Sequence, residues 1–274
     1  MIELQTDAKI AKNGALVTFG LNEGDFLKLI DRIWRKILTN PECLSCRLIL
    51  AFHQILHLSR LFFNFQLLIF NYKLYLCSVK KVLYIHGFAS AGSTGSATQM
   101  RNHLYPKGVQ VISPDVPVDP LKARQMLQEL VQTEQPDLIV ATSMGALYAE
   151  QIRGVKRILV NPSFHMARLL TFRGLGRHDF RNKRQDGATE FKVDKEMIQA
   201  FQQVEKESFK DITAEEKTLV WGLFGTQDKL VNCQADFLKH YGKAQMQLFE
   251  GEHFLNDKVL SKVVMPLVEK IVND

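Results

Sequence analysis

Short apolar runs alternate with amphipathic stretches along residues 79–274. The runs are rich in Val, Ile and Leu, which is typical of parallel strands buried on both faces of a sheet. Strands are expected at residues 81–85, 109–112, 138–142, 157–160, 218–224 and 245–249. Helices are expected at residues 97–104, 120–134, 145–151, 193–208 and 257–272. This alternation predicts a three-layer α/β fold, with a mainly parallel sheet of about six strands and helices on both faces.

Residues 163–211 interrupt the alternation because they show no strand pattern. They include the run RLLTFRGLGRHDFRNKR, in which six Lys or Arg accompany a single acid, Asp179. An insertion at the carboxyl edge of a parallel sheet is expected to cover the pocket as a helical lid. The basic run would either attract an acidic substrate, such as a phosphate-bearing acyl thioester, or form a solvated face, which is the commoner role of such runs.

Residues 1–78 form an apolar-rich extension of different character. An amphipathic helix is expected over residues 23–38, and residues 44–76 are dense in Leu, Ile and Phe. A membrane contact through 44–76 is disfavoured, because its charge-free part, residues 61–72, has twelve residues and a spanning helix needs about twenty. It is also no signal peptide, since the apolar region begins far from a basic start.

The change of character at Ser78 motivates a hypothesis about the start of the protein. Val79 would be the natural first residue if its codon is a misread GTG initiation codon, and residues 1–78 would then be an added piece. Peptides from residues 1–78 in the native protein would overturn this hypothesis.

Charge and cysteine usage narrow the function classes. The net charge of +6 divides evenly, since residues 1–78 hold nine basic and six acidic side chains and residues 79–274 hold 26 and 23. No basic stripe for a nucleic-acid partner follows from this distribution. Three of the four cysteines lie in the extension, which argues against a disulfide scaffold and favours a reducing, cytoplasmic location.

Cys43 and Cys46 form a C-x-x-C pair, with His53 and His57 nearby. A zinc site needs four ligands, and the distance along the chain from Cys46 to His53 is much shorter than in a finger. No second C-x-x-C accompanies the pair. We therefore expect two small apolar thiols and no metal.

The strand at 138–142 leads into ATSMG, which makes Ser143 the candidate nucleophile. In a G-x-S-x-G elbow, small neighbours allow the tight strand-to-helix turn that exposes the serine. Ala141 occupies the first glycine position, so the pentapeptide alone is a moderate signal. The backbone N–H groups of Phe88, in the HG turn after the first strand, and of Met144 are the expected oxyanion donors. The loop ASAGSTGSAT lacks the spacing of a nucleotide-binding turn, and no cofactor is expected.

Two further strands end in residues that can activate a serine. Asp228 follows residues 218–224 in GTQD, and His253 follows residues 245–249 in EGEHF. The order Ser143, Asp228, His253 is that of an α/β-hydrolase triad, in which the histidine is the base and the aspartate orients it. Competing acids are Asp257, which is expected to cap the last helix, and Asp115, whose strand precedes the nucleophile strand.

With these residues identified, residues 79–274 resemble the small bacterial YqiA/YcfP-like esterases of the α/β-hydrolase superfamily. The resemblance rests on the segments KVLYIHGF, ATSMGALYA, LVNPS, LFGTQDKLV and EGEHF. It implies a serine esterase or thioesterase that cleaves a small-molecule ester or acyl thioester without a metal or organic cofactor. Residues 1–78 have no counterpart in it. The alternative is a hydrolase-shaped binding or interaction protein without turnover, against which the presence of all three triad residue types speaks.

Overall fold

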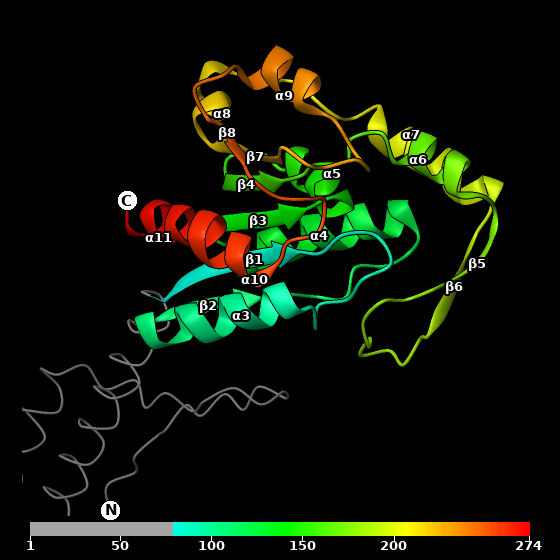
Figure 1. The fold of residues 1–274 in the computed structure, drawn as a ribbon, viewed down its shortest axis with the longest axis horizontal. Coiled ribbons are helices and arrows are strands. Elements are labelled where there is room, and N and C mark those ends of the chain that lie inside the picture. Colours follow the sequence, from blue (N-terminus) through cyan, green and yellow to red (C-terminus); the bar gives the residue numbers. More distant parts are fainter. Residues whose placement is uncertain (1–78) are drawn as a thin grey trace, which may run out of the picture. The chain divides into compact units, whose positions relative to one another are not determined.

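The computed structural model describes residues 79–274, and Figure 1 shows their fold. The predicted extension at residues 1–78, with its helix, its apolar stretch and its C-x-x-C pair, lies outside the described residues. The hypothesis of a start at Val79 therefore stays a prediction. Within residues 79–274, no helix has both the length and the apolar character that crossing a membrane requires.

Six parallel strands form the central sheet, in the order β2-β1-β3-β4-β7-β8. The first strand, β1, pairs with β3 so that Ile85 lies beside Ala141, and Thr142 of β3 lies beside Val160 of β4. The predicted α/β fold is thereby confirmed. The strands are β1 (Lys80–Ile85), β2 (Val109–Ile112), β3 (Leu138–Thr142), β4 (Lys156–Val160), β7 (Val220–Gly225) and β8 (Met246–Phe249).

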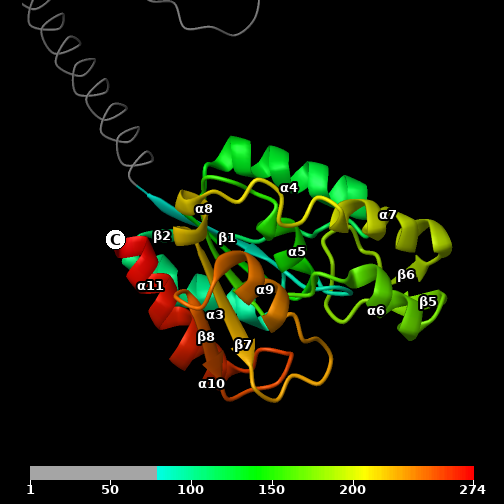
Figure 2. The ribbon, with the colours of Figure 1, turned by 90° about the horizontal axis from the view of Figure 1, so that it is seen from above.

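Helices cover both faces of this sheet (Figure 2). One core cluster joins the sheet to α3 (Gly95–Leu104) and to the C-terminal helical segments. The other joins it to α4 (Pro120–Glu134), α5 (Met144–Glu150), α6 (Met166–Arg173), α7 (Lys195–Glu205) and α9 (Gln234–Tyr241). Strand side chains alternate between the clusters, so Val82 belongs to the first and Leu83 to the second. The remaining short helices are η1 (Tyr105–Lys107) and α8 (Ala214–Thr218).

The insertion between β4 and β7 contains a hairpin as well as helices. Strands β5 (Gly176–Asp179) and β6 (Glu190–Val193) pair antiparallel between α6 and α7. The prediction that residues 163–211 lack strands was wrong. Each strand is four residues long and carries polar side chains at its exposed positions, so its apolar pattern is too short to read from the sequence. We call residues 176–193 the arm.

The closing helix runs through α10 (Asp257–Val259), a π-helical turn (Leu260–Val264) and α11 (Met265–Asn273). Its N-cap is Asn256, whose side-chain oxygen accepts a hydrogen bond from the Val259 N–H at 2.9 Å. The prediction that Asp257 caps this helix was therefore wrong. Asp257 is already helical, and its carboxylate accepts a hydrogen bond from the Gln99 amide at 2.5 Å.

Gly145, in the first turn of α5, allows that helix to approach the end of β1. A Cβ added at Gly145 would lie 2.4 Å from the Ile85 carbonyl oxygen. We expect Gly145→Ala to lower the free energy of unfolding by about 1–3 kcal/mol through overpacking. Gly95→Ala is the control, because nothing lies within 4 Å of the added Cβ and alanine is the better helix former. Urea denaturation measures both, and equal stabilities would contradict this close packing.

Candidate active site

Ser143 lies in the turn between β3 and α5 with a strained backbone, φ 53° and ψ −118°. Non-glycine residues rarely have a positive φ, and they keep it only where the surroundings fix it. Here the Ser143 N–H donates to the Val160 carbonyl, and the Ser143 carbonyl accepts from the Ser163 N–H, both at 3.0 Å. The chain at the end of β4 therefore fixes the conformation that presents the hydroxyl.

Small residues surround this turn. A Cβ on Gly87 would lie 3.2 Å from the Ser143 Cβ, so glycine lets the HG turn pass close to the serine. Ala141, at the first glycine position of the motif, is fully buried in the core cluster that includes α4 and α5. Its methyl group thus packs into the core beneath the turn.

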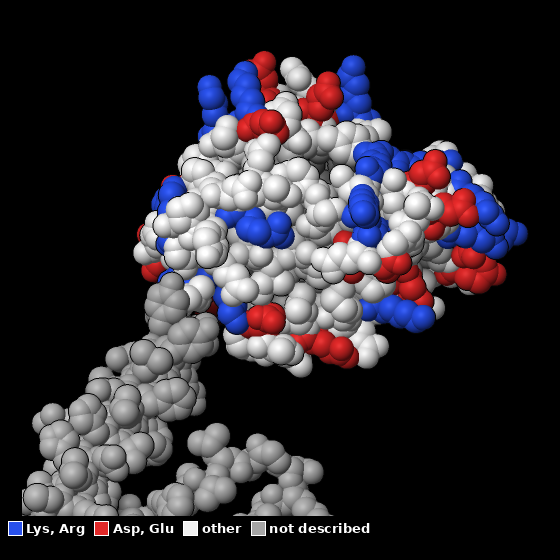
Figure 3. All heavy atoms as spheres, turned by 90° about the horizontal axis from the view of Figure 1, so that it is seen from below, with Lys and Arg blue, Asp and Glu red and all other residues white. Residues whose placement is uncertain are grey.

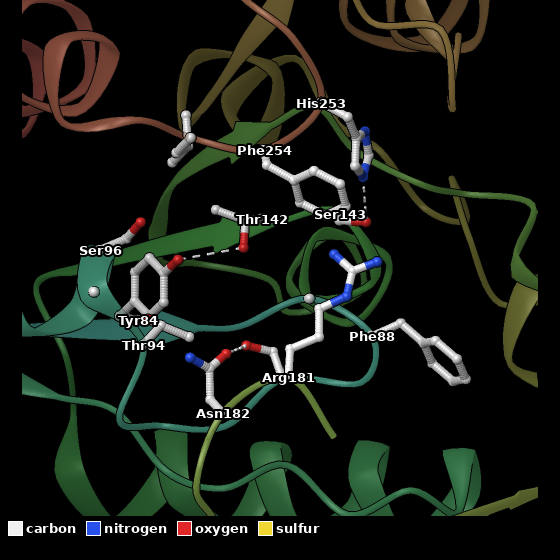
Figure 4. A pocket seen from close by; sticks show the side chains of 14 residues that line it. Tyr84, Phe88, Thr94, Ser96, Thr142, Ser143, Arg181, Asn182, His253 and Phe254 are labelled. Atoms are coloured by element: carbon white, nitrogen blue, oxygen red, sulfur yellow. Dashed lines mark hydrogen bonds between the residues drawn. The ribbon is translucent and has the colours of Figure 1, made fainter. Parts of the chain in front are cut away.

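The structure brings Ser143, Asp228 and His253 into one hydrogen-bonded chain. His253 Nε2 lies 2.9 Å from Ser143 Oγ, and Figure 4 marks this hydrogen bond with a dashed line. His253 Nδ1 lies 2.7 Å from Asp228 Oδ2. The side chains of His253 and Asp228 are 7% and 5% exposed. This geometry lets the imidazole accept the serine proton while its other nitrogen donates to the carboxylate.

Asp228 remains ionised in this partly buried place. Burial raises the pKa of its carboxyl, but hydrogen bonds from His253 and from the backbone N–H groups of Val231 and Leu230 outweigh that effect, and the pKa lies below its ordinary value. The two backbone bonds, at 3.0 and 2.8 Å, reach Oδ1. Oδ2 is thus left for the imidazole.

Asn161, which directly follows β4, connects the loops that carry the acid and the base. Its side-chain amide donates to the carbonyls of Glu252 and His253 at 2.9 and 3.0 Å. Its oxygen accepts from the Gly225 N–H at 2.7 Å. The sequence alone does not indicate this role of Asn161, because these contacts join residues far apart in the chain.

The N–H groups of Phe88 and Met144 donate to no other group among residues 79–274. Met144 is the first residue of α5, so its N–H has no acceptor within the helix. Phe88 follows Gly87, which lies against Ser143. Both predicted donors are therefore free amides on the two chain segments that flank the serine.

His86 fixes the orientation of the peptide that contains the Phe88 N–H. The buried imidazole accepts from the Val116 N–H through Nε2 at 2.9 Å and donates through Nδ1 to the Gly87 carbonyl at 2.8 Å. In a trans peptide the C=O and N–H point in opposite directions, so this bond directs the Phe88 N–H away from His86. Burial lowers the pKa of His86 and Arg184 lowers it further, and together they outweigh the hydrogen bond to Gly87 and the charge of Asp115, which raise it. Because Nε2 also accepts from the Val116 N–H, the imidazole is neutral.

Asp115, the other competing acid, connects two loops. Its carboxylate accepts from the Gly92 N–H and from the Gln185 N–H, each at 2.6 Å. Gln185 belongs to the arm, and Gly92 lies in the loop after β1. Asp115 therefore helps to hold the arm and does not contact His253.

One group of side chains in the described part of the chain has a spacing that could hold a metal ion: His165, Cys233 and Asp236, whose ligand atoms lie within 4.8 Å of one another. His165 already forms a 3.0 Å hydrogen bond with Asp236. Burial raises the pKa of the Cys233 thiol to about 11, so without a metal it is protonated at neutral pH. The prediction that the chain uses no metal stays a prediction.

A cavity of about 180 Å³ opens beside Ser143. Figure 4 shows Tyr84 and Thr142 on one side of it and Arg181 and Asn182, from the arm, on another. The sequence contains the basic run at residues 168–184 but does not indicate which of its members lines the site.

Comparison with known proteins identifies the family and the fold. The model of "Uncharacterised protein family (UPF0227)" matches residues 81–263. No curated protein sequence matches the chain. Est1E from Butyrivibrio proteoclasticus superposes with a TM-score of 0.52 at 20% identity, over 71% of this chain and 87% of that one.

Two further solved structures superpose on this chain to a similar extent. Est1E with ferulic acid bound gives a TM-score of 0.53 at 17% identity, over 71% of this chain and 90% of that one. A putative hydrolase from Agrobacterium vitis S4 gives 0.51 at 12% identity, over 70% and 88%. These identities show the α/β-hydrolase fold alone, and they confirm the fold expected from the sequence.

The neutral state of His86 makes a pH-dependent contribution to stability. In the unfolded chain this imidazole takes up a proton below its ordinary pKa of about 6.5, whereas in the folded protein it takes up a proton only at lower pH. The contribution of His86 to the free energy of unfolding is therefore fully present above about pH 6.5 and is lost as the pH falls toward the lowered pKa of the folded protein. We expect the free energy of unfolding to fall less steeply between about pH 7.5 and 5.5 in His86→Gln than in the wild type. Parallel curves would contradict the neutral, buried imidazole.

Proposed function

We propose that this chain, which belongs to the UPF0227 family, is a serine hydrolase that cleaves carboxylic esters or acyl thioesters through an acyl-serine intermediate. The observation that carries the proposal is the continuous chain of hydrogen bonds from Asp228 through His253 to the strained Ser143. A hydroxyl is a weak nucleophile without an adjacent base. Acyl transfer also needs donors that stabilise the oxyanion of the tetrahedral intermediate. The free N–H groups of Phe88 and Met144 beside Ser143 can supply them.

In the first half of the reaction, Ser143 Oγ attacks the carbonyl carbon while His253 Nε2 takes the hydroxyl proton. The carbonyl oxygen becomes an oxyanion between the N–H groups of Phe88 and Met144. Each such donor stabilises the transition state by about 2.7–4 kcal/mol. The ionised Asp228 stabilises the imidazolium and holds its tautomer.

The tetrahedral intermediate then collapses. The bond to the alcohol or thiol breaks, and His253 gives its proton to that leaving group. Water attacks the acyl-serine in the second half, with His253 as the base again, and the carboxylic acid is released as Ser143 regains its proton. Est1E has been solved with ferulic acid, a carboxylic acid, and we propose the same chemical class of product here.

A fluorophosphonate probe tests the nucleophile. Wild-type protein should be labelled, because the activated Ser143 hydroxyl attacks phosphorus as it attacks a carbonyl carbon, and Ser143→Ala should not. Ser261→Ala, at an exposed serine in the closing helix, should be labelled like the wild type. Absence of labelling in the wild-type protein would favour a binding protein without turnover.

The acid is tested by two matched amide substitutions. Asp228→Asn should lower kcat on p-nitrophenyl esters and acyl-CoAs by about 10³–10⁴-fold, because an amide does not hold the productive imidazole tautomer. Asp257→Asn should leave kcat nearly unchanged, since Asp257 is exposed and contacts Gln99. Equal losses in both variants would mean that the acid is misassigned.

A further inference from the structure

We infer that the cavity beside Ser143 binds a carboxylate group of the substrate through Arg181 and Asn182, so that the preferred esters are half-esters of dicarboxylic acids. The inference deepens the proposed function by naming the substrate class. Its binding step can be tested without turnover.

The arm is held against the core by hydrogen bonds at Arg181 and at the two residues that follow Asn182. The Arg181 N–H donates to the Ala89 carbonyl at 2.8 Å, and the Ser93 hydroxyl donates to the Lys183 carbonyl at 2.6 Å. Arg184, which is buried, donates to the Val116 carbonyl at 3.1 Å. The backbone that carries Arg181 and Asn182 is thus fixed at the cavity and does not depend on a bound ligand.

The Arg181 guanidinium extends toward Ser143 and Phe254 in Figure 4. It lies 4.3 Å from the centre of the Phe254 ring, and stacking of this kind leaves the edge N–H donors free. No carboxylate within residues 79–274 forms an ion pair with it. Its planar fork therefore remains available for a carboxylate that enters from solvent.

Two other basic residues of the arm are neutralised by acidic side chains of the arm itself. Arg177 pairs with Glu190 at 2.6 Å, and Arg184 pairs with Asp186 at 3.0 Å. Figure 3 shows basic and acidic side chains interspersed at this end of the molecule. The arm is thus no uniform basic surface, and these ion pairs distinguish Arg177 and Arg184 from Arg181, whose guanidinium has no acidic partner among the described residues.

Arg173 adds to the positive field at Arg181. Arg173 is exposed at the end of α6, and partial desolvation together with the charge of Arg181 lowers its pKa. Among the described residues Arg173 forms no ion pair. A bound anion would relieve this repulsion.

The lining of the cavity matches an anion of small size. None of the residues that line it is acidic. The Asn182 oxygen accepts from the Ser90 hydroxyl at 2.8 Å, which leaves its NH₂ group without a partner in the described chain. A cavity of about 180 Å³ is below the roughly 300–1,000 Å³ of sites for larger ligands. It suits a short chain with one carboxylate rather than a nucleotide.

Binding is measured on Ser143→Ala protein by NMR titration with two esters that differ in one charge, monomethyl adipate and dimethyl adipate. The monoanion should bind about tenfold tighter or more, as expected for a charge-assisted, bidentate contact. Adding Arg181→Gln should abolish that preference and leave dimethyl adipate unaffected. Adding Lys183→Gln removes the same charge from the arm at a residue outside the cavity lining, and it should preserve the preference.

Equal binding of the two esters, absence of measurable binding by both, or a preference that survives Arg181→Gln would overturn the inference. A second measurement, the hydrolysis of the monoester and the diester by protein with Ser143 intact, distinguishes failure of this inference from failure of the proposed function. If the protein hydrolyses neutral esters but the titration shows no preference for the monoanion, the proposed hydrolase activity is supported and the proposed anion site is contradicted. If the protein binds the monoanion selectively but hydrolyses neither ester, the proposed anion site is supported and the proposed hydrolase activity is contradicted.

Discussion

The positive φ of Ser143 determines how the rest of the site is arranged. A serine keeps this conformation because β4 and the chain after it form hydrogen bonds with both its N–H and its carbonyl. The same two bonds fix where the hydroxyl stands above the carboxyl edge of the sheet. Gly87 and Gly145 provide the space that this turn needs, since any larger residue at Gly145 would meet the end of β1.

Around this turn, each functional group is placed by a contact with a neighbouring strand end. Asn161 holds the carbonyls of the loop that carries His253, and the neutral His86 orients the peptide that includes the Phe88 N–H. The strand order reverses between β1 and β3, and ligands of open α/β sheets bind at such a reversal. Both the nucleophile and the proposed oxyanion donors lie there.

The sequence predicted most of this arrangement, because buried parallel strands have a strong apolar pattern and their carboxyl ends must meet at one edge. Ser143, Asp228 and His253 each follow such a strand, and the structure joins them by hydrogen bonds. Two local assignments failed: the strands of the arm are too short and polar to read, and the cap of the last helix is Asn256. The position of Arg181 could not be predicted either, since it depends on bonds between the arm and loops about ninety residues away.

The proposed mechanism requires that Ser143 attack a carbonyl group whose oxygen then accepts hydrogen bonds from the N–H groups of Phe88 and Met144. The most direct measurement is a crystal structure of the protein after reaction with a p-nitrophenyl alkylphosphonate, whose tetrahedral adduct resembles the intermediate. We expect phosphorus to be bonded to Ser143 Oγ, with one phosphoryl oxygen within hydrogen-bond distance of the Phe88 and Met144 N–H groups. An adduct on another residue, or a phosphoryl oxygen directed away from these amides, would contradict it.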